Sequence, residues 1–112
     1  MNVSLKKQIT KEFIQTVSDL AKINKLETFF GDLLGEKDFE KIVKKLAIAY
    51  WIIKKRDDQN IKNNLEVSEK EIAEIRGKLN LKGVKLALKY LTAEEWANVW
   101  SEKIKEITNL TK

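Results

Sequence analysis

Basic side chains are the groups in this chain whose types and positions are best suited to bind a ligand. A cationic run near the middle of the sequence is followed at once by an amphipathic segment that carries more of them. Ammonium, guanidinium and hydroxyl groups donate hydrogen bonds to phosphate oxygens, so these residues predict contacts with the backbone of double-stranded DNA. The predicted contact residues are Lys54, Lys55, Arg56, Lys62, Ser68, Lys70, Arg76 and Lys78.

The segment that must position these residues, 57–79, is predicted to be a helix-turn-helix. Its second helix begins at Ser68, because Ser68 and Glu71 have the spacing of a capping box. Asp57 and Asp58 precede the first helix, as N-cap residues commonly do. Apolar residues recur at helical spacing on both sides of the turn. They are Ile61, Leu65, Val67, Ile72, Ile75 and Leu79.

Composition narrows the class of protein. The 112 residues are expected to form a single all-helical domain over 1–112, and a hydrophobic fraction of 43% is typical of a globular fold. There is no cysteine and no histidine, which excludes thiolate metal sites and histidine-based catalysis within one chain. We expect no enzyme, no cofactor and no metal. The sequence has neither a signal peptide nor an apolar run of roughly 20 residues, so we expect a cytoplasmic protein with no membrane partner.

The net charge of +5 favours an anionic partner such as nucleic acid. Only two of the basic residues, Arg56 and Arg76, are arginines, the side chain that most often reads base edges. Lys82, Lys85 and Lys89 could supply further phosphate contacts, independent of sequence. The alternative for each of these lysines is an ordinary solvated surface position.

Helical periodicity runs through almost the whole chain and predicts an all-α fold. The central helix is apolar on two sides, which indicates either a partner chain or coverage by the N-terminal helices; both alternatives stay open. Trp96 and Trp100, four residues apart, are more typical of a core or a dimer interface than of a ligand cage. Helices are predicted over 4–22, 25–34, 36–55, 58–65, 68–79, 83–91 and 93–108.

The order of these elements resembles the tryptophan repressor family of helix-turn-helix proteins. The resemblance covers residues 29–79, and residues 13–30 resemble the first helices of the family. It implies an intertwined homodimer that places paired recognition helices about one helical turn of DNA apart. The residues that carry it are Leu33 with Leu34, Glu36 with Asp38, Ile52 with Ile53, Gln59 with Ile61, and Val67 with Ser68.

The chain departs from the family where tryptophan binds. Family members hold the ligand between two arginines, and the corresponding positions here are Lys45 and Glu74. A carboxylate facing the ligand carboxylate would repel it, so we expect no tryptophan binding. Glu66 occupies the turn position where glycine is preferred, and is expected to adopt a strained left-handed conformation. Lys62 stands where the two helices touch, so its stem is expected to extend outward.

These observations predict a homodimeric DNA-binding transcriptional regulator that does not respond to tryptophan. The second helix of the helix-turn-helix carries three acids, Glu69, Glu71 and Glu74, which oppose approach to DNA. The alternative is therefore a dimeric helical module that retains the fold, has lost sequence-specific DNA binding and binds another protein.

Overall fold

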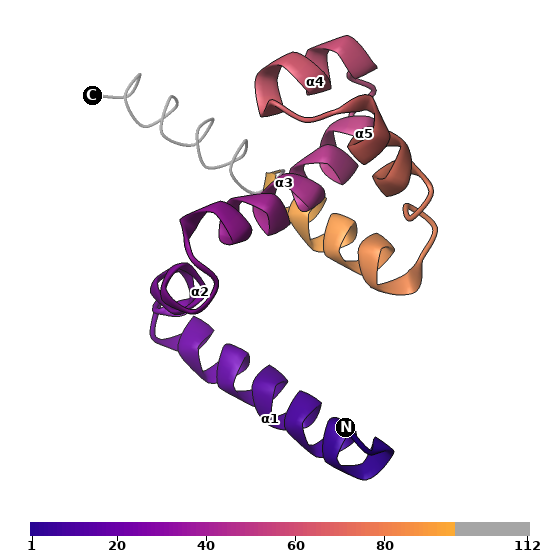
Figure 1. The fold of residues 1–112 in the computed structure, drawn as a ribbon. Helices are drawn as coiled ribbons and strands as arrows, with labels where there is room; N and C mark the ends of the chain where they lie inside the picture. Colours follow the sequence, from indigo (N-terminus) through magenta and orange to yellow (C-terminus); the bar gives the residue numbers. More distant parts are fainter. Residues whose placement is uncertain (96–112) are drawn as a thin grey trace, which may run out of the picture. The chain divides into compact units, whose positions relative to one another are not determined.

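The computed structural model describes residues 1–95, and all regular structure within them is α-helical (Figure 1). The all-α class predicted from the sequence is confirmed. The chain divides into two compact units, Met1–Ile42 and Val43–Lys112, and each is described by itself. The helices are α1 (Val3–Lys22), α2 (Leu26–Leu34), α3 (Glu36–Ile53), α4 (Asp58–Leu65), α5 (Glu69–Arg76) and a further helix that includes residues 82–95.

Two helices end earlier than predicted, because the backbone leaves helical geometry before the apolar pattern ends. The central helix ends at Ile53 rather than at residue 55, since Lys55 has a positive φ of 65°. Its amide donates to the Ile52 carbonyl and the Arg56 amide donates to the Trp51 carbonyl, the bonds of a Schellman turn. The helix predicted over 68–79 ends at Arg76, because Gly77 is a poor helix former and caps it.

The predicted boundary between helices 83–91 and 93–108 is wrong. Residues 82–95 form one uninterrupted helix, so Thr92 lies within a helix and does not begin one. The Ser/Thr-x-x-Glu pattern caps a helix only where the chain has already left helical geometry. The residues just before Thr92 include no glycine or proline that would end the preceding helix. The prediction for residues 96–108, including Trp96 and Trp100, lies outside the described residues.

In the first unit, α1 packs against α2 through aromatic rings. Phe13 of α1 lies 6.5 Å from Phe29 and 6.4 Å from Phe30 of α2, measured between ring centroids. Phe30 in turn lies 5.8 Å from Phe39, in the first part of α3. Asn24, a residue that tolerates positive φ, ends α1 with φ 58°. No residue of α1 or α2 is fully buried, so these two helices form no closed core among residues 1–95.

The second unit has the buried core. Its members come from the C-terminal half of α3, from α4, from α5 and the turn before it, and from the helix of residues 82–95. Burial of aliphatic side chains is the main stabilising contribution to such a core. The core therefore fixes α4, α5 and the turn between them against α3. The buried residues are Ile48, Ala49, Ile61, Val67, Ile72, Ile75 and Leu88.

Candidate nucleic-acid interface

Helices α4 and α5, with the turn between them, form the two-helix unit that residues 57–79 predict (Figure 1). The two helices pack through Ile61 of α4 and Ile72 of α5, both with an exposed fraction of 0%. Val67 of the turn is 7% exposed and closes this contact from the loop side. The apolar spacing in the sequence therefore identified the residues that hold the two helices together.

The start of each helix is capped as predicted. The Asp57 carboxylate accepts the Asn60 amide at 2.7 Å at the start of α4. At the start of α5 the Ser68 hydroxyl accepts the Glu71 amide at 3.1 Å, and the Glu71 carboxylate accepts the Ser68 amide at 3.0 Å. This reciprocal pair satisfies two amides that a helix start leaves unbonded. It fixes where α5 begins, and so which of its side chains face outward.

The turn between the helices has the conformation that the sequence made us expect. Glu66 adopts φ 54° and ψ 53°, the left-handed helical region, although it is not glycine. Its amide donates to the Lys62 carbonyl, and the Val67 amide donates to the same carbonyl at 3.3 Å. An L-residue in this region is strained by roughly 1–2 kcal/mol. The tight turn is thus maintained by the packing of Val67 and by these bonds, against a local backbone preference.

Arg76, a predicted DNA contact, is paired within the protein. Its guanidinium donates to both carboxylate oxygens of Asp58, at 2.6 Å and 3.3 Å, so the end of α5 is joined to the start of α4. The guanidinium holds the pKa of the Asp58 carboxyl below its ordinary value, and the carboxylate raises the pKa of Arg76. Both side chains are about half exposed, at 46% and 54%, so a phosphate could still approach the guanidinium.

Two further predicted contacts, Lys62 and Lys54, also have acidic neighbours. The Lys62 ammonium lies 3.8 Å from Glu69, and its side chain is 43% exposed, as a stem that extends out of a helix contact should be. The Lys54 ammonium lies 3.2 Å from Glu95. The Tyr50 hydroxyl also donates to Glu95, and together these partners lower the pKa of the Glu95 carboxyl while that of Tyr50 is raised.

Arg56 is held by an aromatic ring rather than by an acid. Its guanidinium carbon lies 4.0 Å from the centroid of the Trp51 ring, and Nη1 donates to the Asn60 side chain at 3.2 Å. Stacking on tryptophan leaves the guanidinium charge unneutralised and restricts its position. The sequence analysis missed this arrangement, and also missed Asp58 and Glu95 as partners of basic residues.

Lys55, Lys70 and Lys78, like Arg56, stay exposed with no ion pair within residues 1–95. Lys70 lies in the first turn of α5, and Lys78 follows its last turn. Ser68 is exposed, and its hydroxyl oxygen is used as the cap of α5. The structure thus places the eight predicted residues on α4, on α5 and in the turns that adjoin them, but some of their charges are paired with acids and others are not.

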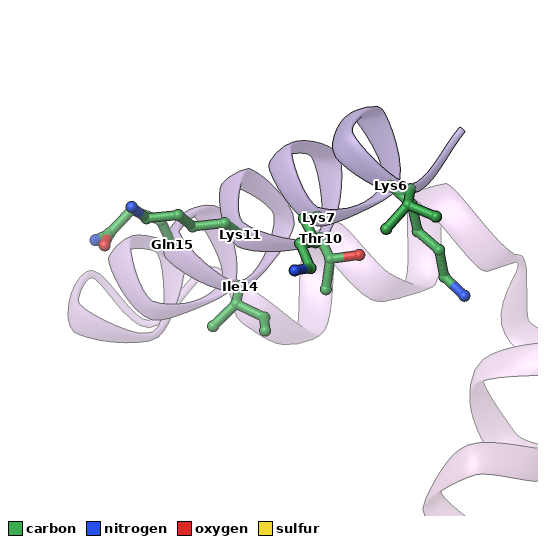
Figure 2. Close-up of a pocket in the computed structure, with 7 residues that line it drawn as sticks. Lys6, Lys7, Thr10, Lys11, Ile14 and Gln15 are labelled. Carbon is green, nitrogen blue, oxygen red and sulfur yellow. The ribbon is translucent and has the colours of Figure 1, made fainter. Parts of the chain in front are cut away.

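A shallow hollow on the described surface lies elsewhere, along α1 (Figure 2). It has a volume of about 610 Å³ and is open to solvent. All seven lining residues come from one helix, Val3 to Gln15, and none of them is acidic. A depression with one helical wall and no carboxylate offers no acid–base pair, so we assign it no chemistry.

Among residues 1–95, none of the helices combines the length and the hydropathy that a membrane span requires. The same residues hold no cluster of three acidic side chains close enough together to bind a metal ion. Comparison of the chain with protein-family models, curated proteins and solved structures finds no match.

Proposed function

We propose that this chain is a DNA-binding transcriptional regulator of the tryptophan-repressor-like kind, acting in the cytoplasm. The observation that carries the proposal is the α4–turn–α5 unit, with its buried Ile61–Ile72 contact and its capped second helix. In a helix-turn-helix of this construction the second helix lies in the major groove of the duplex, and the first crosses the backbone. Helix α5 is therefore the proposed recognition helix.

Contacts with DNA are proposed to come first from the basic residues that have no acidic neighbour. Lys55, Lys70 and Lys78 are exposed, and Arg56 is stacked on Trp51 with its charge available. Lys54, Lys62 and Arg76 contribute less, because each must share or give up a carboxylate partner before it binds a phosphate. These are largely backbone contacts, so affinity should exceed sequence specificity.

The regulator is proposed to act as a homodimer. Helix α1 has no buried residue, and its apolar side chains Leu5, Ile9 and Phe13 are each 43–44% exposed. A stripe repeated every four residues along a 20-residue helix is suited to pack against another helix of the same kind. A second copy supplies such a helix, and two-fold pairing would set two copies of α5 about 34 Å apart, at successive major grooves.

The dimer is tested by light scattering on the purified protein. Two molecules of 13.0 kDa should give a particle of about twice that mass. Replacing Leu5 and Ile9 with serine should shift the mass toward that of one chain. The control replaces Lys7 and Lys11, on the polar side of α1, with serine and should leave the dimer intact. A wild-type protein of single-chain mass at micromolar concentration would refute the dimer.

Tryptophan is proposed not to be an effector. The two positions that would bind its carboxylate in the resembling family hold Lys45 and Glu74, and both are exposed. A carboxylate at Glu74 repels a ligand carboxylate, and nothing else in α5 supplies a bidentate cation at that position.

The alternative function is a dimeric interaction module that binds another protein and not DNA. The acidic residues of α5 favour this alternative, because Glu69, Glu71 and Glu74 lie on the same short helix as Lys70 and oppose its attraction for phosphates. Phosphate-driven binding weakens steeply as salt rises, whereas binding through apolar contacts does not. Salt dependence therefore separates the two functions.

The experiment that tests the proposed function is fluorescence anisotropy of a labelled duplex of random sequence, at 50 and 200 mM salt. We expect binding in the micromolar range or tighter at low salt, with a large loss at 200 mM. Lys70→Glu should weaken binding by about tenfold, because it exchanges attraction for repulsion at the phosphate. The matched control is Lys7→Glu on α1, which makes the same charge change far from α5 in sequence. Absence of duplex binding at 50 mM salt would refute the proposal.

A further inference from the structure

The residues after α5 differ sharply in charge from the helix-turn-helix itself. Within α4, α5 and their turns almost every cation has an acid close by in the sequence. Residues 77–93, by contrast, contain four lysines and no acidic residue at all. A stretch of 17 residues with charge of one sign produces a local positive potential that the balanced charges of α4 and α5 cannot produce.

Three of these lysines, Lys82, Lys85 and Lys89, form what we call the lysine stripe. They are spaced by three and four residues on the helix of residues 82–95, so they lie on one face. Leu88 of the same helix is 6% exposed and belongs to the core, which directs the stripe away from the core. All three lysines are exposed, and none has an ion pair with another residue of the described chain.

The dimensions of the stripe match a nucleic-acid strand. Lys89 lies seven positions after Lys82, which is about 10 Å along a helix axis. A duplex presents one phosphate per roughly 3.4 Å of axis on each strand, so the stripe covers about three phosphates. Three ammonium groups on long, flexible stems can each reach one of them, without requiring a particular base sequence.

We propose that the lysine stripe is a principal contact surface for the phosphate backbone of duplex DNA, beside the helix-turn-helix. This inference rests on the proposed function and deepens it, because it places much of the binding free energy outside the acidic recognition helix. The stripe adds no base reading, since lysine presents a point charge and no planar fork. It supplies affinity, and α5 supplies whatever discrimination between sequences there is.

The stripe has apolar neighbours that suit a different partner. Leu86 is 54% exposed and Tyr90 is 71% exposed, on the same helix. A protein partner could use such side chains, but it would gain little from three unpaired lysines unless it were acidic. The continuous positive charge favours the polyanion, and the salt dependence of duplex binding decides between the two.

The test compares two triple variants in the anisotropy assay, over 50–200 mM salt. K82Q/K85Q/K89Q removes the stripe, and K7Q/K11Q/K22Q removes three exposed lysines from the polar side of α1. Both variants lower the net charge of +5 by three, so they differ only in where the charge is lost. Each phosphate contact contributes about 0.9 to the slope of log K against log salt. The stripe variant should therefore lose about 2.7 from the slope, and at least tenfold in affinity at 50 mM.

A third variant, K82R/K85R/K89R, keeps the charge and should bind with the wild-type slope, which separates loss of charge from loss of folding. If the wild-type chain binds duplex steeply with salt and the stripe variant keeps that slope, the inference is wrong and the proposed function stands. If the α1 variant loses as much slope as the stripe variant, net charge alone explains binding and the inference is again wrong. If the wild-type chain binds no duplex at 50 mM salt, both the proposed function and the inference fail.

Discussion

Replacing Glu66 with glycine should stabilise the protein, contrary to the usual effect of adding a glycine. Glu66 has φ 54° and ψ 53°, where an L-residue is strained by roughly 1–2 kcal/mol and glycine is not. Glycine also loses more conformational freedom on folding, which costs roughly 0.5–1 kcal/mol. The difference leaves a net gain of about 0.5–1 kcal/mol for Glu66→Gly. The Glu66 side chain makes no hydrogen bond or ion pair with another side chain among residues 1–95, so none is lost with it.

The assay is urea unfolding followed by circular dichroism at one fixed protein concentration, because the stability of a dimer depends on concentration. This assay gives the difference in the free energy of unfolding directly. In a thermal unfolding experiment, a gain of about 1 kcal/mol would raise the melting temperature by about 4 °C. Glu66→Ala is the control, since alanine removes the charge and keeps the strain. It should leave stability nearly unchanged.

Two results would contradict this reasoning. If Glu66→Gly is no more stable than Glu66→Ala, then the left-handed conformation is not the source of strain. If both variants are equally stabilised, repulsion among nearby acids is being relieved, and the backbone has no part in the effect. Lys55, with φ 65° at the end of α3, gives an independent site at which Lys55→Gly should behave in the same way.

Three further predictions concern the cap, the ion pair and the ligand. Ser68→Ala should lower the free energy of unfolding by about 1 kcal/mol in the same urea assay, because it leaves an amide of α5 without a partner. The Asp58–Arg76 pair lowers the pKa of Asp58, so its contribution is complete above the ordinary aspartate value of 3.8 and is lost as the pH falls through the lower folded value. Asp58→Asn should therefore be less stable than wild type at pH 7 and lose that difference in acid; a difference that persists at pH 2 would count against the pair. Calorimetric titration with tryptophan should show no binding, and micromolar affinity would overturn the argument from Glu74.

Features whose cause lies within about four residues could be predicted from the sequence. The capping box at Ser68, the N-cap at Asp57 and the left-handed turn at Glu66 each follow from neighbouring residues, and all three are present. The buried contact of Ile61 with the second helix followed from apolar spacing alone. A repeat of 3–4 residues reports directly on one face of a helix, which is why this part of the inference succeeded.

A local pattern gave a wrong prediction at Thr92, because the helix is not interrupted there. Thr92 has the spacing of a capping box with Glu95, yet residues 82–95 remain one helix. A capping pattern within good helix-forming sequence has nothing to cap, because the amides it would satisfy are already bonded one turn back. Gly77 had the opposite effect and ended α5 three residues before the apolar pattern did.

The pairing of charges could not be predicted, because it depends on tertiary positions. Asp58 and Arg76 are 18 residues apart, and Lys54 and Glu95 are 41 apart. In a chain with 22 basic and 17 acidic residues, no spacing rule selects these partners from the many others. The sequence could name the cations of the candidate interface, but only the fold shows which of them are already neutralised.

That distinction bears directly on how the chain would bind DNA. Arg76, the arginine on the proposed recognition helix, joins the end of α5 to the start of α4 through Asp58. The Arg76 guanidinium would thus have two roles. It holds α5 against α4, and it is also a positive charge on the proposed recognition helix. A phosphate that attracted Arg76 would compete with the ion pair that positions α5. Cations that make no ion pair within the protein can bind phosphates without losing such a pair. Within the described chain these cations include Lys70, Lys78 and the lysine stripe. An acidic proposed recognition helix is then compatible with duplex binding, because the attraction we propose for DNA would arise beside that helix and not on it.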